Sequence, residues 1–163
     1  MPQSPRSRED GDRLGFDETR DYLGAAVAAL LPASLIARGL SVAVDTDREV
    51  YAPGDPVSVR VVLRNRLPVP VAVTTPSRRL WGWEVDGALE ASEEPRRDPG
   101  GSGTLSFRAR ERKTREWTWD GRVTRRDDRG VRSSPLGRGD HEIRAFVATD
   151  RERPEARTTF RIE

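Results

Sequence analysis

The stretch "VSVRVVLRN", residues 57–65, decides the fold, because its apolar side chains recur at every second position. The apolar face would carry Val57, Val59, Val61 and Leu63. Arg60 and Arg64 fall on the opposite face, and this period of two is typical of a strand with one buried side. Residues 57–65 therefore predict a β-strand that covers a core.

The same alternation recurs on both sides of this strand, with turn residues between the segments and no helical period. The predicted strands are 40–46, 57–65, 66–75, 79–87, 104–110, 112–121, 141–149 and 156–163. Their spacing predicts an all-β protein, an immunoglobulin-like antiparallel β-sandwich with a short N-terminal helix. The residues expected in or near its core are Val42, Val59, Val61, Leu63, Val85, Phe107, Ile143 and Phe160.

All four tryptophans fall into two W-x-W pairs, in "LWGWEVDG" and "EWTWDG", and each pair is soon followed by Asp-Gly. Side chains two residues apart on a strand point to the same face. Trp81 therefore shares a face with Trp83, and Trp117 shares one with Trp119. We expect at least one pair in the core between the sheets, because large aromatic rings on alternating strands mostly pack inward. The alternative is an outer aromatic platform that binds a ligand.

The segment before the first strand differs in composition from the rest of the chain. Residues 1–15 are polar and rich in breakers and predict a disordered tail, and residues 16–39 predict an apolar helix capped by Asp17. The run 22–37 has no charged residue, but it is shorter than the ~20 residues that span a bilayer, and Pro32 should break or kink it. Three interpretations of this run are open. It forms a helix packed on the domain or on a partner, it associates with a membrane, or it belongs to a processed or misassigned start of the chain. The sandwich domain then covers residues 40–163.

Charge is dense but balanced, with 29 basic and 27 acidic residues and a net charge of +2. Lys113 is the single lysine, so nearly all of the basic side chains are arginines. A near-neutral total argues against a dedicated nucleic-acid binder. The chain has no cysteine, which excludes disulfides and thiolate metal sites and fits a cytoplasmic protein.

The order of the strands resembles the BsuPI-like family of intracellular proteinase inhibitors. The quoted phrases are "YAPGDPV", "PVPVAVTTPS", "LWGWEVDG", "WTWDG" and "LGRGDHEIRAFVAT". The positions that carry the resemblance are Asn65, Pro70, Val71, Trp83, Val85, Gly87, Trp119, Asp120 and Gly139. The chain also resembles small uncharacterised haloarchaeal proteins. The resemblance implies an immunoglobulin-like domain that inhibits a protease, although "ALEASEEPRRDPGGSG", residues 88–103, replaces that family's aromatic-rich stretch.

Candidate catalytic and metal-binding groups are sparse. The single histidine, His141, has neither a cysteine nor a serine elbow to act with, so we expect it to be hydrogen-bonded at a strand edge. The pairs Asp45/Asp47 and Asp127/Asp128 lack the spacing of a calcium loop and should accept local backbone N–H groups. We therefore expect no catalytic residue, no metal and no cofactor, with an enzyme acting through His141 as the alternative.

Two long polar segments, 88–103 and 122–139, are the expected partner-binding loops, because the loops of a sandwich usually carry its binding sites. The candidate residues are Glu93, Arg96, Arg97, Arg125, Arg126, Arg129 and Arg132. An exposed sheet edge is the second candidate surface. The sequence thus predicts a non-enzymatic protein-binding module whose partner, by resemblance, is a protease. The alternative is an accessory domain anchored to a membrane by residues 22–37.

Overall fold

The computed structural model describes residues 31–94, 100–150 and 153–163. One helix and twelve strands lie in this part of the chain. Their bounds are α2 (Ala33–Gly39), β1 (Leu40–Thr46), β2 (Val50–Tyr51), β3 (Val57–Asn65), β4 (Val71–Thr75), β5 (Trp81–Val85), β6 (Ala88–Leu89), β7 (Gly103–Phe107), β8 (Arg112–Trp119), β9 (Arg122–Asp127), β10 (Gly130–Pro135), β11 (Gly139–Val147) and β12 (Glu155–Ile162).

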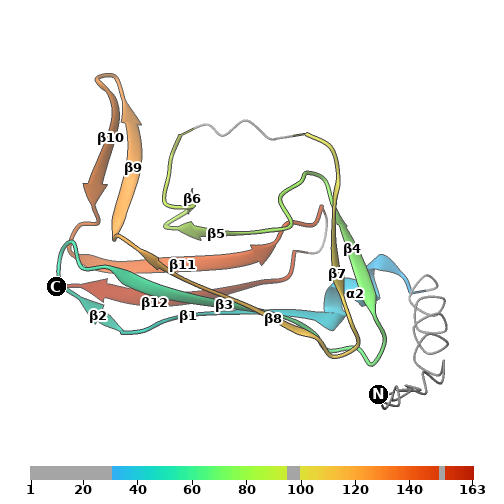
Figure 1. Cartoon of the computed structure of the whole chain (residues 1–163). Coiled ribbons are helices and arrows are strands. Elements are labelled where there is room, and N and C mark those ends of the chain that lie inside the picture. Colours follow the sequence, from blue (N-terminus) through green and yellow to red (C-terminus); the bar gives the residue numbers. More distant parts are fainter. Residues whose placement is uncertain (1–30, 95–99, 151–152) are drawn as a thin grey trace, which may run out of the picture.

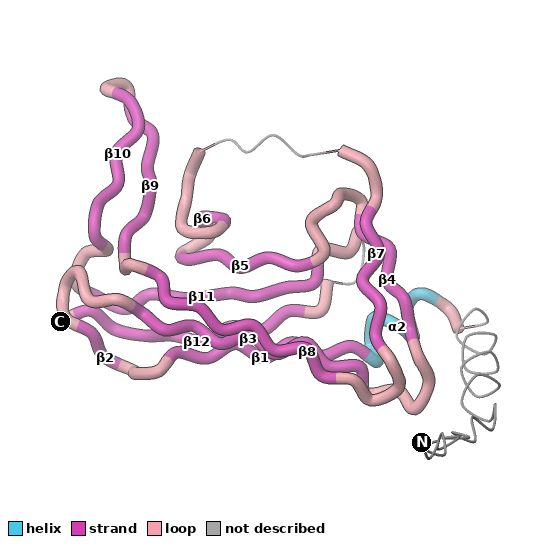
Figure 2. The backbone as a smooth tube through the Cα atoms, in the orientation of Figure 1, coloured by secondary structure: helices cyan, strands magenta, loops and turns pink. Residues whose placement is uncertain are grey.

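The strands form an immunoglobulin-like β-sandwich, as the sequence predicts (Figures 1 and 2). One sheet has the order β1-β3-β8, and the facing sheet has the order β2-β12-β11-β5-β6. Neighbouring strands are antiparallel except for β2 and β12, which are parallel. Two further ribbons, β4-β7 and β9-β10, extend from the ends of the sandwich.

Strand β3 has the predicted alternation, and the side chains from Val57 to Leu63 on its inner face are at most 3% exposed. Seven of the eight predicted core residues are buried, and Val42 is half-buried against the core. Burial of this apolar face stabilises the fold because about 25 cal/mol is gained for each Å² removed from water.

Both tryptophan pairs point between the sheets, with only Trp119 fully buried. The Trp83 ring centroid lies 5.1 Å from that of Trp117 and 6.0 Å from that of Trp119. Trp81 packs on Trp117 at 5.9 Å. The prediction of at least one core pair is confirmed, and the rings join β5 of one sheet to β8 of the other. Within the described residues, the buried Nε1–H of Trp117 is a donor without an acceptor.

A corner forms where β3 continues into β4 and where β7 continues into β8. Asn65, which is fully buried, holds this corner: its Nδ2 donates to the Val69 carbonyl at 2.8 Å and to the Arg108 carbonyl at 2.9 Å. Its Oδ1 accepts the Leu67 N–H at 2.9 Å. The amide side chain therefore replaces strand pairing where the ribbon bends, since buried backbone groups need partners.

Helix α2 begins directly after Pro32, whose carbonyl accepts the Leu35 and Ile36 N–H groups. Residues 16–30 of the predicted helix lie outside the described residues, as does the predicted tail 1–15. None of the helical segments in the described part of the chain has the length and apolar character that a membrane crossing requires.

The prediction of eight strands is incomplete. All eight are present, but the predicted loop 122–139 is wrong, because most of it forms the hairpin β9-β10. The two-residue strands β2 and β6 were also missed. The hairpin carries charged residues on both faces, so it lacks the apolar alternation on which the prediction relied.

Candidate functional site

The β9-β10 hairpin projects from one end of the sandwich, at the upper left of Figures 1 and 2. Its register pairs Gly130 with Asp127 at the tip and Pro135 with Arg122 at the base. The tip turns at Asp128 and Arg129, and the Asp127 carboxylate accepts the Arg129 N–H at 2.8 Å. This local bond is the role predicted for Asp127.

The base of the hairpin is fixed to the core. Val123 and Leu136 are 3% and 4% exposed, and the Leu136 N–H donates to the Gly121 carbonyl. The indole of Trp119 donates to the Arg122 carbonyl at 2.8 Å. Gly121 has a φ of +68°, and a Cβ there would lie 2.6 Å from the Asp55 carbonyl oxygen, so this link requires glycine.

The two segments predicted as binding loops meet at this base. Ser92 forms a β-bridge with Thr124, and Thr124 N–H donates to the Ala91 carbonyl at 2.9 Å. Arg125 Nε lies 3.3 Å from Glu93 Oε1. The structure therefore brings Glu93 and Arg125 together, whereas Arg96 and Arg97 lie outside the described residues.

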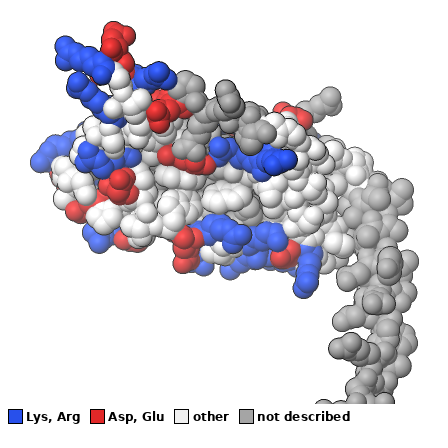
Figure 3. Space-filling view, turned by 45° about the horizontal axis from the view of Figure 1, so that its top comes forward, with Lys and Arg blue, Asp and Glu red and all other residues white. Residues whose placement is uncertain are grey.

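The other three predicted arginines, Arg126, Arg129 and Arg132, are exposed on the hairpin. Within the described residues, none of the three forms an ion pair. Arg132 stands directly opposite Arg125, and Arg126 stands opposite Val131, which is 50% exposed. Blue and red atoms alternate on this projection in Figure 3. The hairpin thus offers cationic side chains beside an apolar one.

His141 links the base of the hairpin to the turn between β5 and β6. Its Nδ1 lies 2.7 Å from Asp86 Oδ2, and its Nε2 lies 2.8 Å from the Gly137 carbonyl. Its ring packs on Phe160 at 5.6 Å. Both ring nitrogens face hydrogen-bond acceptors, which leaves neither open to a substrate in this arrangement. The predicted backbone bond is present, and the Asp86 carboxylate is an additional partner.

The other predicted aspartate pair lies on β1 and just after it. Asp47 accepts the Tyr51 hydroxyl at 2.7 Å and the Ser58 N–H at 2.9 Å. The hydrogen bond from Tyr51 lowers the pKa of the Asp47 carboxyl, and burial raises the pKa of the Tyr51 hydroxyl. No group of three or more histidine or carboxylate side chains is gathered for a metal ion within the described residues.

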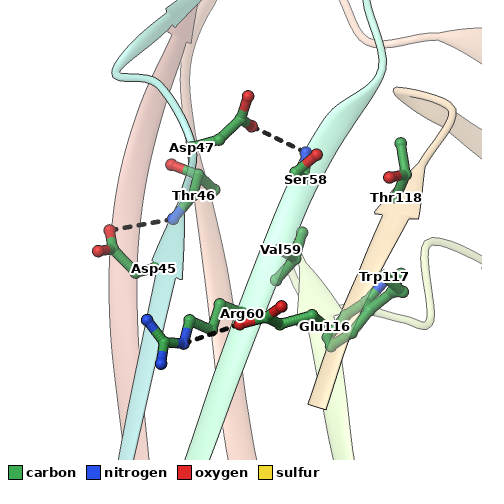
Figure 4. A pocket seen from close by; sticks show the side chains of 9 residues that line it. All are labelled: Asp45, Thr46, Asp47, Ser58, Val59, Arg60, Glu116, Trp117 and Thr118. Carbon is green, nitrogen blue, oxygen red and sulfur yellow. Dashed lines mark hydrogen bonds and ion pairs between the residues drawn. The ribbon is translucent and has the colours of Figure 1, made fainter. Parts of the chain in front are cut away.

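A depression of about 520 Å³ is lined by residues of β1, β3 and β8 and by Asp47 just after β1 (Figure 4). Arg60 crosses it to Glu116, with Nε and Oε1 3.0 Å apart, and Asp45 accepts the Thr46 N–H at 3.0 Å. The charged groups that line it are therefore engaged with their neighbours, and the depression offers little to an external ligand.

Sequence reasoning missed a second basic surface, at the corner held by Asn65. The run "RARERKTR", residues 108–115, was the available signal, with five basic residues and one acidic residue. It was overlooked because the two halves of this surface are more than 40 residues apart in sequence and meet only when β3 pairs with β8.

Comparison with known proteins identifies the family of the chain. No curated protein matches the sequence. Among solved structures, a CARDB domain from Pyrococcus furiosus is 14% identical, with a TM-score of 0.45 over 76% of this chain and 94% of that one. The sporulation control protein Spo0M from Bacillus subtilis is 12% identical, with a TM-score of 0.46 over 77% of this chain and 49% of that one.

A β-glucosidase from Listeria innocua is 9% identical, with a TM-score of 0.45, and the match covers 76% of this chain but 16% of the enzyme. The model of a family of unknown function, DUF7974, matches residues 28–163. Because this match spans most of the chain, the protein belongs to the DUF7974 family.

Proposed function

We propose that this protein is a non-enzymatic module that binds another protein through its β9-β10 hairpin. The observation that carries the proposal is the exposure of Arg126, Arg129 and Arg132 on a ribbon whose base is fixed to the core. Arginine is enriched among the residues that dominate interface energies. A ribbon that is already ordered loses little conformational entropy when it binds.

The non-enzymatic part of the proposal rests on His141. Its two ring nitrogens lie within 2.8 Å of Asp86 and Gly137, so the single histidine serves to hold the hairpin base. A general base needs a free nitrogen within reach of the proton that it removes. A cytoplasmic partner is the working assumption, because the chain has no cysteine.

The resemblance to the BsuPI-like inhibitors makes a protease the first class of partner to test. Inhibition is titrated against purified serine, cysteine, aspartic and metalloproteases. The hairpin variant R126E/R129E/R132E should lose inhibition, whereas R64E/R66E/R112E, with the same charge change elsewhere, should keep it. Equal loss in both variants would show that net charge, and not the hairpin, is responsible.

Binding to a partner other than a protease is tested with a photo-crosslinking amino acid placed at Val131. The matched control is Val50 on β2, which is 47% exposed where Val131 is 50% exposed. In native lysate, the crosslinker at position 131 should give discrete protein adducts, and the crosslinker at position 50 should give none. Adducts of the same mass from both positions, or none from position 131, would remove the hairpin as the binding element.

A further inference from the structure

Five exposed arginines crowd the corner where β3 ends and β8 begins. They are Arg64, Arg66, Arg108, Arg110 and Arg112, and we call them the basic corner. Arg64 and Arg112 are directly opposite each other in the β3-β8 register. The Arg66 and Arg110 backbones are held by hydrogen bonds to the Gly39 and Leu67 carbonyls. The charges are therefore brought together by the fold and held there.

The charge of the basic corner is not neutralised. Within the described residues, none of its five arginines forms an ion pair. Glu111 is the single acidic residue in 64–66 and 108–112, and its carboxylate is already bound to Lys113 Nζ at 3.0 Å and to the Arg108 N–H at 2.6 Å. Like charges placed opposite each other destabilise a sheet. An anionic surface that covers the cluster would offset the repulsion between its arginines.

The basic corner lies beside helix α2. The end of α2 contacts it through the bond from Arg66 N–H to the Gly39 carbonyl, 2.8 Å long, and β1, which follows α2, pairs Ser41 with Arg64. Leu35 on α2 is 46% exposed. The helix carries no charged side chain from Ala33 to Ala37. A short apolar helix and a cluster of cations therefore meet at this corner of the described structure.

We propose that the basic corner docks on a membrane surface rich in anionic lipid headgroups. Stable membrane association needs two signals, such as an apolar element and a basic patch, and here α2, with its exposed Leu35, is hydrogen-bonded to the basic corner. Each basic residue near an anionic surface strengthens binding roughly fivefold. Single-stranded nucleic acid is usually bound by arginines interleaved with aromatic rings, and residues 64–70 and 108–112 contain no aromatic residue.

The test is flotation of the full chain with phosphatidylcholine vesicles, with and without phosphatidylserine. We expect binding to depend on phosphatidylserine and to weaken with added salt, because exposed charges are screened. R64E/R66E/R112E should bind at least about tenfold more weakly, and the neutral R64Q/R66Q/R112Q should fall in between. The matched control R126E/R129E/R132E should stay within about twofold of the native chain. Thermal melting confirms that each variant is folded.

Equal binding to vesicles without phosphatidylserine, or equal loss in the corner and hairpin variants, would overturn the proposal. Tighter binding to a single-stranded oligonucleotide than to the vesicles, abolished in R64E/R66E/R112E, would assign the corner to nucleic acid instead. The membrane proposal does not depend on the hairpin, because the crosslinking at Val131 and the flotation report on different residues. Each can fail while the other holds.

Discussion

Two arginine-rich surfaces of this molecule differ in how their charges are arranged. On the outer face of β5, β11 and β12, the arginines and carboxylates alternate and pair. Arg144 lies 2.7 Å from Glu84 and 3.2 Å from Glu155, and Arg157 lies 3.1 Å from both Glu142 and Glu155. The hydrogen bond to Glu155 raises the pKa of the Arg157 guanidinium. At the basic corner, five arginines surround one carboxylate that is already bound.

The difference shows that a net charge of +2 is a poor guide to the surface of this protein. Balanced totals hide one face that is neutralised internally and one corner that is not. Internal ion pairs restrict side chains and stabilise the sheet modestly. Unpaired arginines are available to a partner. The paired face therefore contributes to the stability of the sheet, and the arginines of the basic corner form no ion pair within the described residues.

The largest effect expected concerns the residue that shapes the basic corner. Asn65→Ala should lower the free energy of unfolding by about 3 kcal/mol, because it leaves the Val69 and Arg108 carbonyls and the Leu67 N–H without their partner. Chemical denaturation measures the change. The neighbouring Arg64→Ala is the control and should change it by less than about 0.5 kcal/mol. A similar small change in both would mean that Asn65 does not hold the corner.

A substitution of Arg144, on the outer face of β5, β11 and β12, should lower the free energy of unfolding. Arg144→Met should lower the free energy of unfolding by about 1–2 kcal/mol, because the Arg144 side chain is 24% exposed and its loss leaves the Glu84 side chain, 15% exposed, without a cation. Chemical denaturation measures the change, and Arg126→Met on the hairpin, the control, should leave the denaturation midpoint almost unchanged. Adding Glu84→Gln to Arg144→Met should restore part of the loss. If it does not, packing and not the ion pair explains the cost.

The carboxylate at the corner should give a smaller, pH-dependent effect. The Arg108 N–H and the Lys113 ammonium lower the pKa of the Glu111 carboxyl below its usual range. A carboxyl with a lowered folded pKa stabilises the protein above its unfolded pKa of about 4.3, and this stability is lost as the pH falls. The native chain should therefore be more stable than Glu111→Gln at neutral pH, and the difference should vanish in acid. A constant difference across the pH range would contradict the assignment.

The smallest effect has the opposite sign. Arg112→Glu should raise stability by about 0.5 kcal/mol, because it replaces a pair of facing arginines with an ion pair to Arg64. Arg112→Gln should give about half of that gain. Thermal melting at low salt measures both, and high salt should reduce both gains. A loss of stability would show that the arginines at the corner already have compensating partners.

Much of the sandwich could be predicted from local pattern. The alternation in residues 57–65 identified β3 and its buried face, and the paired tryptophans identified the strands that line one edge of the core. The hairpin β9-β10 could not be found in this way. Apart from Val123 at its base, its side chains are not buried on either face, so its strands are defined by backbone pairing, which leaves no apolar period in the sequence.

The candidate site residues were also predicted where they are close in sequence and missed where only the fold brings them together. Composition pointed to Arg125, Arg126, Arg129 and Arg132 because they are close together along the chain, but it did not show that Glu93 joins Arg125 at the hairpin base. The basic corner was not foreseen, because Arg64 and Arg112 become neighbours only across the β3-β8 pairing.

The sequence by itself determined the fold class, the strands with one buried face and the inward direction of the tryptophans, since each of these follows from side chains a few residues apart. The tertiary structure alone decided which charges are paired and which are left free. Strand register sets those distances, and electrostatic energy depends on distance in space and not on separation along the chain.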